Sequence, residues 1–108
     1  MKNVEMERVV IIGSSCSGKT TMARRLADIL QTPHIELDAI HWLPDWQERE
    51  DDEFRELVGT AVAADRWVVD GNYNMVRDIV WPRATTLVWL NHSFLVVFWR
   101  AFSRTTVR

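Results

Sequence analysis

A glycine-bounded loop between an apolar run and a helical pattern constrains the fold of this chain more than any other feature. The loop, Gly13-Ser14-Ser15-Cys16-Ser17-Gly18-Lys19-Thr20, fits the pattern G-x-x-x-x-G-K-[ST]. Residues 8–12 before it are a short, β-branched run that is typical of a buried parallel strand. Residues 20–30 after it carry apolar side chains at helical spacing. This order predicts a strand, a phosphate-binding P-loop and a helix.

The residue types of the loop suit an anionic ligand. Gly13 and Gly18 let the backbone turn tightly and approach a phosphate with no Cβ in the way. Lys19 can reach the β- and γ-phosphates and the Thr20 hydroxyl can bind Mg²⁺, so ATP and Mg²⁺ are the predicted ligands. Cys16 is interpreted as an oxidation liability near a helix N-terminus rather than as a nucleophile. The candidate nucleotide-binding residues are Gly13, Ser14, Ser15, Cys16, Ser17, Gly18, Lys19, Thr20 and Thr21.

The size and charge of the chain are those of an ordinary globular protein. Its 108 residues suit a single domain, residues 1–108, with one core. A net charge of −2 gives no general attraction to nucleic acid or to an anionic membrane. Cys16 is the only cysteine, so an intramolecular disulfide is excluded and a reducing, cytoplasmic location is expected. Polar residues interrupt the most apolar region, residues 84–102, so no membrane span is expected.

Strand-like and helix-like segments alternate along the chain. The expected strands are residues 8–12, 34–37, 66–69 and 85–90, and the expected helices are residues 20–31, 50–64, 73–80 and a last helix from Ser93. Residues 39–49 have no clear period and are expected to form a loop or a broken helix. The alternation predicts an α/β fold, with three α/β/α layers around a parallel sheet of about four strands, as in P-loop NTPases. Ligands bind such sheets at the carboxyl ends of the strands.

Two aspartates end apolar strands at this edge. Asp70 ends the third expected strand, where P-loop proteins place a carboxylate that holds Mg²⁺ directly or through water. We favour this metal role for Asp70 over that of a turn residue. Asp38 ends the second expected strand and is a candidate general base, acceptor-binding group or further metal ligand. For Asp38, the role of an N-terminal cap of a following helix stays open beside these.

Further polar and aromatic residues follow the strand ends. The candidates for a substrate pocket are His41, Trp42 and Asn72. Trp46 is interpreted as a packing residue, and Arg77 as either a phosphate clamp or a solvated side chain. Three C-terminal arginines are spaced four apart, so on a helix they share a face that lines a phosphate channel or is solvated. They are Arg100, Arg104 and Arg108.

Motifs along nearly the whole chain match those of a known group. They are the Gly13–Thr20 loop, Glu36-Leu37-Asp38-Ala39-Ile40-His41-Trp42 with Pro44 and Trp46, Trp67-Val68-Val69-Asp70-Gly71-Asn72-Tyr73, Arg77 with Trp81-Pro82-Arg83-Ala84, and Arg100 with Arg104. On these residues the chain resembles the adenylate-kinase-like P-loop kinases labelled topology modulation proteins. The resemblance implies a nucleoside-triphosphate-dependent phosphotransferase fold with ATP and Mg²⁺, but it does not define the phosphate acceptor.

Loop, strand ends and resemblance together predict transfer of the ATP γ-phosphoryl group to a small-molecule acceptor such as a nucleotide. Lys19 would hold the phosphates, Thr20 and Asp70 the Mg²⁺, and Asp38 would orient the acceptor or act as its base. The transferring charge would be stabilised by arginines, namely Arg77, Arg100 and Arg104.

The chain departs from this group at its C-terminus. Members of the group usually continue into a lid and a fifth strand, which we expect to be largely missing here. The expected last helix is apolar almost all round from Phe94 to Phe102, so we predict self-association through it. The alternative function is a catalytically weak or inactive nucleotide-binding module that acts through self-association or a partner.

Overall fold

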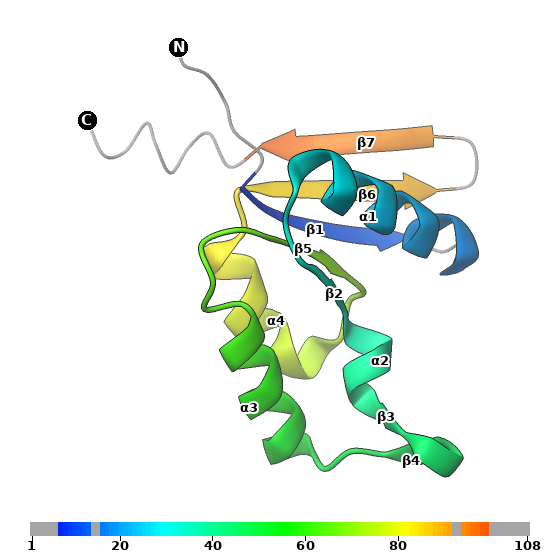
Figure 1. Ribbon diagram of the computed structural model, residues 1–108, viewed down its shortest axis with the longest axis vertical. Coiled ribbons are helices and arrows are strands. Elements are labelled where there is room, and N and C mark those ends of the chain that lie inside the picture. The colour runs from blue at the N-terminus through cyan, green and yellow to red at the C-terminus, as the bar shows by residue number, and fades with distance from the viewer. Residues whose placement is uncertain (1–6, 14–15, 92–93, 100–108) are drawn as a thin grey trace.

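The computed structural model describes residues 7–13, 16–91 and 94–99 (Figure 1). In chain order the elements are β1 (Arg8–Gly13), α1 (Cys16–Leu30), β2 (His34–Glu36), α2 (Leu37–His41), β3 (Trp42–Leu43), the 3-10 helix η1 (Pro44–Trp46), β4 (Gln47–Glu48), α3 (Asp51–Ala61), β5 (Trp67–Asp70), α4 (Asn74–Val80), the 3-10 helix η2 (Trp81–Arg83), β6 (Thr86–Asn91) and β7 (Phe94–Trp99). The four expected strands and the first three expected helices are confirmed, with bounds that differ by a few residues.

The main sheet has five strands in the order β2-β5-β1-β6-β7. β1 lies between β5 and β6 and is parallel to both, with Val10 opposite Val69 on one side and Leu87 on the other. β2 is parallel to β5. The parallel part therefore has the four strands that the sequence predicted, and the fold is α/β. Because these strands run the same way, their carboxyl ends meet at one edge, which we call the rim.

Helices cover both faces of the sheet. Side chains along a strand alternate between the two faces, so each strand contributes to a core on either side. From β1, Val9 and Ile11 pack in one cluster with Ala23 of α1. Val10, between them, belongs to a second cluster with Phe54 of α3 and side chains of α4. Figure 1 shows α3 and α4 side by side and apart from α1. The predicted three-layer arrangement is therefore confirmed in the described chain.

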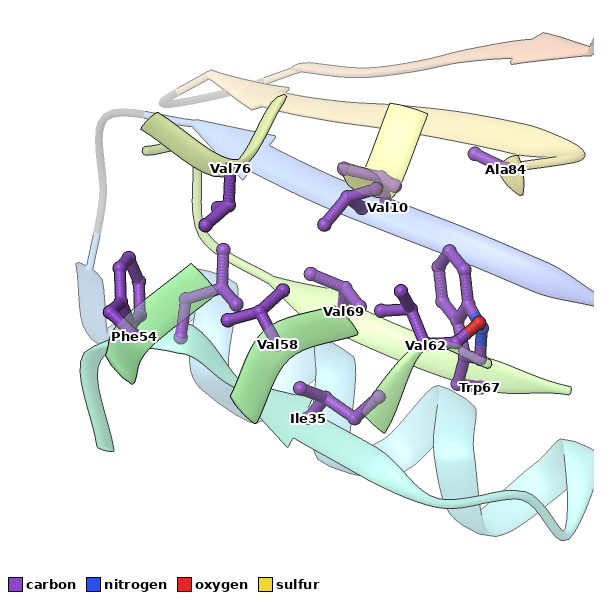
Figure 2. Close-up of a cluster of buried hydrophobic side chains, with 11 residues drawn as sticks. Val10, Ile35, Phe54, Val58, Val62, Trp67, Val69, Val76 and Ala84 are labelled. Carbon is purple, nitrogen blue, oxygen red and sulfur yellow. The ribbon is translucent and has the colours of Figure 1, made fainter. Parts of the chain in front are cut away.

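The larger cluster lies between the sheet and the α3–α4 layer (Figure 2). Its buried members are Val10, Ile35, Leu37, Phe54, Val58, Val62, Trp67, Val69, Val76, Val80 and Ala84. Trp67 at the start of β5 is fully buried, and its indole N–H donates to the carbonyl oxygen of Val62 at 3.0 Å. The polar atom of this large side chain is thus satisfied, and the ring contributes its apolar area to the core.

An ion pair joins α3 to α4. Arg55 donates to both carboxylate oxygens of Asp78, at 2.9 and 3.0 Å, and to the carbonyl oxygen of Met75 at 2.5 Å. The hydrogen bonds between the two side chains are the main cause that raises the pKa of Arg55 and lowers the pKa of Asp78. Solvent screens this surface pair, so its contribution to stability is small. Its two-point geometry fixes α4 against α3.

The prediction of a C-terminal helix from Ser93 is wrong for residues 94–99. These residues form β7, which pairs antiparallel with β6 so that Val88 lies opposite Val97. The run is apolar throughout, so it lacks a period that separates helix from strand, and its β-branched and aromatic residues suit a strand. β7 also pairs the side of β6 that would otherwise be an open edge. β7 is antiparallel and precedes the place of the lid, so it is not the fifth strand that the resemblance places after the lid.

The other predictions for the C-terminal region are not tested by the described residues. Ser93 and the arginines at positions 100, 104 and 108 lie outside the described residues. Self-association stays a prediction, although the segment assigned to it is a strand rather than a helix over residues 94–99. Within the part of the chain that the structure describes, every helix is too short or too polar to cross a membrane.

Residues 39–49, expected to be a loop or a broken helix, include the end of α2 and the hairpin β3–β4, in which Trp42 pairs with Glu48. At the hairpin turn, Asp45 and Trp46 are left-handed, with φ of 69° and 60°. This conformation costs a non-glycine residue roughly 1–2 kcal/mol. Trp46 is 84% exposed, so its interpretation as a packing residue is wrong.

We expect Gly13→Ala to destabilise the fold by about 3 kcal/mol or more, because overpacking a rigid contact strains the backbone. A Cβ at Gly13 would overlap the carbonyl oxygen of Leu90 on β6, and relief would require moving two paired strands apart. Gly59→Ala in α3 is the matched control, since a Cβ there meets only Ile79 Cγ2 at 3.9 Å. Alanine should stabilise that helix by up to about 1 kcal/mol. Urea unfolding measures both, and equal midpoints would contradict the close approach of β1 and β6.

Candidate functional site

The P-loop and the strand ends meet at the rim. β1 ends at Gly13 and α1 begins at Cys16, so the predicted strand and helix flank the loop motif, but the helix begins four residues earlier than expected and includes the second half of the motif. Ser14 and Ser15, between them, lie outside the described residues. On the first turns of α1, Gly18 and Thr20 are half-buried, Lys19 is buried and Thr21 is exposed. The helix after the loop therefore turns its lysine into the protein.

Lys19 forms a buried ion pair with Asp70. Lys19 Nζ donates to Asp70 Oδ1 at 2.7 Å, and the two side chains are 10% and 1% exposed. Asp70 ends β5, directly beside β1, so the strand order brings this carboxylate to the helix that follows the loop. His34 of β2 places its Nε2 atom 3.4 Å from the other carboxylate oxygen, Oδ2. We call Lys19, His34 and Asp70 the Lys19 cluster.

The Lys19 cluster satisfies the requirements of a buried charge. A charge taken out of water costs several kcal/mol unless it is paired and hydrogen-bonded. Each oxygen of Asp70 has a partner, a lysine on one side and a histidine ring nitrogen on the other. A cation and an anion are therefore held in contact at the predicted phosphate- and metal-binding positions.

Asp38 makes a second short contact at the rim. Its Oδ1 accepts a hydrogen bond of 2.5 Å from the hydroxyl of Tyr73. Burial, and then this hydrogen bond, raises the pKa of Tyr73 well above its ordinary value, while a hydrogen bond with Trp42 lowers it. The phenol therefore keeps its proton at neutral pH and serves as a donor. The helix-cap interpretation of Asp38 is wrong, because α2 begins at Leu37 and has no side-chain cap.

His41 packs within an aromatic cluster next to this pair. Its ring centroid lies 5.0 Å from that of Trp42, 5.1 Å from Phe54 and 4.7 Å from Tyr73. His41 is only 6% exposed, and its Nδ1 atom has no hydrogen-bond partner among the described residues. We call Asp38, His41, Trp42, Phe54 and Tyr73 the Tyr73 cluster. It brings together three of the predicted substrate-side residues, namely Asp38, His41 and Trp42.

Residues 70–73 connect the two clusters. Gly71 has a φ of 128°, a conformation that side chains rarely adopt, and its N–H donates to the Ile11 carbonyl oxygen at 3.0 Å. A Cβ at Gly71 would lie 3.1 Å from Leu37 Cβ. The chain therefore turns sharply between β1 and the start of α2, which takes it from Asp70 directly to Tyr73.

Asn72 and Arg77 form a separate exposed group. Arg77 donates to Asn72 Oδ1 at 3.2 Å, and its guanidinium carbon lies 5.0 Å from the ring centre of Trp81. This geometry engages the guanidinium within its own segment, and the roles of Arg77 as a phosphate clamp and of Asn72 as a substrate residue stay predictions. The lid-side arginines, Arg100 and Arg104, lie outside the described residues.

The predicted Mg²⁺ site has few protein ligands. Among residues 7–13, 16–91 and 94–99, no group of three or more His, Cys, Asp or Glu side chains is arranged to hold a metal ion. Thr20 and Asp70 would therefore supply only part of a Mg²⁺ shell. Mg²⁺ is commonly bound through one or two carboxylates together with waters and substrate phosphates, so these residues fit such a site.

Three residues of these clusters, namely His34, Phe54 and Tyr73, had no predicted role at the site. His34 could have been found, because the period of two along β2 puts it on the same face as Glu36, which lies opposite Asp70. The contact of Tyr73 depends on where α2 lies relative to the start of α4. No local pattern signals that placement.

The fold is α/β, with a parallel sheet between helices and the loop motif at the rim. The chain is similar to a solved structure described as a gluconokinase from Sinorhizobium meliloti 1021, with a TM-score of 0.51 and 22% sequence identity. The similarity covers 80% of this chain and 57% of that chain, so this chain spans little more than half of its neighbour's length. No protein-family model matches the chain, and no curated protein matches it either.

We expect Lys19→Met to lower the free energy of unfolding by about 3–5 kcal/mol, because it leaves the buried carboxylate of Asp70 without its cation. The double variant Lys19→Met/Asp70→Asn should recover most of this loss, since it removes both charges. Urea unfolding of the wild type and the two variants tests this. Equal destabilisation by the single and double variants would show that the ion pair is not the reason for the loss.

Tyr73 is the only tyrosine of the chain, so ultraviolet titration of tyrosinate reports on its hydrogen bond directly. Asp38→Asn should lower the pKa of Tyr73 towards the ordinary value of 10.0 but not fully, because burial remains its largest cause. Since the pKa is raised in the folded state, the associated stability is present below pH 10 and is lost as the pH rises above it. An unchanged titration in the variant would contradict the Asp38 contact.

Proposed function

We propose that this protein is a P-loop phosphotransferase that moves the γ-phosphoryl group of Mg·ATP to a small hydroxyl acceptor. The observation that carries the proposal is the buried ion pair of Lys19 and Asp70 beside the P-loop. Apolar residues of similar volume would often stabilise a fold as well as such a pair does. A cation and a carboxylate kept in contact at a phosphate-binding loop are better accounted for by a ligand that needs both.

The nucleotide side consists of the loop and the Lys19 cluster. Bound phosphates offer Lys19 a new anionic partner, and the freed carboxylate of Asp70 then faces the place of the metal together with Thr20. His34 keeps one oxygen of Asp70 engaged during this exchange. Mg²⁺, when bound, would neutralise charge that develops on the phosphate oxygens. The ion pair thus keeps both groups in place without leaving either charge unpaired in the interior.

The acceptor side is the Tyr73 cluster. Asp38 would accept the proton of the acceptor hydroxyl, whose oxygen bonds to the γ-phosphorus while the bond from that phosphorus to the bridging oxygen breaks and ADP leaves with the electron pair. Trp42 is 38% exposed beside it and supplies an apolar wall. Because a neighbour is described as a gluconokinase, gluconate is the first acceptor to try, followed by nucleoside monophosphates.

The finer assignment follows the sequence motifs. We propose membership of the topology modulation group of adenylate-kinase-like kinases, on the segments around Asp38 and Asp70 that carry that resemblance. We also propose a cytoplasmic location, because the chain has a single cysteine, Cys16, and binds a cytoplasmic nucleotide.

Calorimetric titration of Mg·ATP, followed by product analysis of the same samples, tests the proposal. The wild type should bind, and the charge-free variant Lys19→Met/Asp70→Asn should lose at least about 100-fold in affinity, because it lacks the charge-assisted contacts to phosphate and metal. Arg24→Ala is the matched control, since it removes an exposed cation from the same helix. It should leave binding unchanged.

Each outcome separates the two candidate functions. Binding with ADP formation that increases on adding an acceptor supports the phosphotransferase. Binding without turnover favours the nucleotide-binding module. An equal loss of affinity in Arg24→Ala and in the charge-free variant would indicate general electrostatic attraction and would contradict a site at Lys19.

A further inference from the structure

We propose that Tyr73 is a positioning residue that holds the carboxylate of Asp38 in one orientation towards the acceptor. The inference rests on the proposed function, because it concerns the acceptor side of the same site. It assigns a role to a hydroxyl that had no predicted role, and it makes the orientation of Asp38 dependent on the segment that also carries Asp70.

The hydrogen bond has a defined direction. A carboxylate only accepts, so the 2.5 Å contact means that the Tyr73 hydroxyl donates to Asp38 Oδ1. The phenol proton therefore points at Asp38.

The ring of Tyr73 is itself fixed by packing. Its centroid lies 4.7 Å from the His41 ring and 5.3 Å from the Phe54 ring, and both of those side chains are buried. Asp38, by contrast, is exposed on α2. An exposed aspartate ordinarily rotates among several side-chain conformers. The rigid donor is therefore on the tyrosine side of the contact, and the group that it restrains is the carboxylate.

Restraining one oxygen leaves the other for chemistry. Oδ1 is engaged by Tyr73, whereas Oδ2 has no hydrogen bond within the described chain. With Oδ1 held, Oδ2 has a fixed place at which to meet an acceptor hydroxyl. Because the Tyr73 proton stays on the phenol, the proton that Asp38 accepts comes from the acceptor alone and is released to solvent after the product leaves.

Tyr73→Phe tests the inference, because it removes the hydroxyl and keeps the ring that packs on His41. The probe is Mg·ATP with water as the acceptor, so no second substrate has to be identified. We expect kcat for ADP formation to fall about 10- to 100-fold, the range of a hydrogen bond to a charged group. The KM and the calorimetric Kd for Mg·ATP should stay within about twofold, because the side-chain contacts described for Tyr73 are with the acceptor side, namely Asp38, His41 and Phe54.

Two further variants separate positioning from a structural effect. Asp38→Asn/Tyr73→Phe should be no slower than Asp38→Asn alone, because without the carboxylate of Asp38 the tyrosine has no base to position. Thr60→Val is the matched control, since it removes another exposed hydroxyl hydrogen bond, 3.0 Å to the Glu56 carbonyl oxygen on α3. It should leave kcat unchanged.

Different results would overturn this inference alone and the proposed function. If the wild type turns over and Asp38→Asn is slow while Tyr73→Phe is as fast as the wild type, Asp38 acts without the tyrosine and the inference is overturned. It is also overturned if the two single effects multiply in the double variant. A wild type that does not bind Mg·ATP, or binds it without turnover, overturns the phosphotransferase proposal and this inference together.

Discussion

The contact between Lys19 and Asp70 is the interaction on which the rim depends. It joins α1 to β5 at 2.7 Å, and so fixes the helix that follows the P-loop against the strand beside β1. Opposite charges attract strongly away from water, but each has given up its hydration to be there. The ion pair therefore adds little net stability, but it fixes the place of Lys19, the one lysine of the loop motif.

The buried polar side chains show where polar groups have lost their hydration on folding. Among the described residues, the buried polar or charged side chains are Lys19, His41, Asp70 and Thr86. The first three belong to the two clusters described above, whereas Thr86 lies at the start of β6. The Nδ1 atom of His41 has no hydrogen-bond partner among the residues that the structure describes. Buried polar groups without full compensation are typical of places where a ligand or a reaction requires them.

The sequence predicted those parts of the site that follow from one strand at a time. β1 and β5 are short β-branched runs, so their ends, and with them the P-loop and Asp70, could be assigned to one edge of a parallel sheet. The contact of Tyr73 with Asp38 joins residues 35 positions apart and depends on how α2 and α4 pack. β7 was missed for a different reason, because its unbroken apolar run suits a buried helix and a strand equally.

The chain itself limits the distance between the two halves of the site. Three residues of extended backbone span at most about 10–11 Å, so the Cα atoms of Asp70 and Tyr73 cannot lie farther apart than that. The positive φ of Gly71 bends the segment, and its bond to Ile11 holds the bend against β1. Lys19 pairs with one end of this segment and Asp38 with the other. A short covalent segment therefore limits how far apart the backbones of the phosphate side and the acceptor side can lie along the rim.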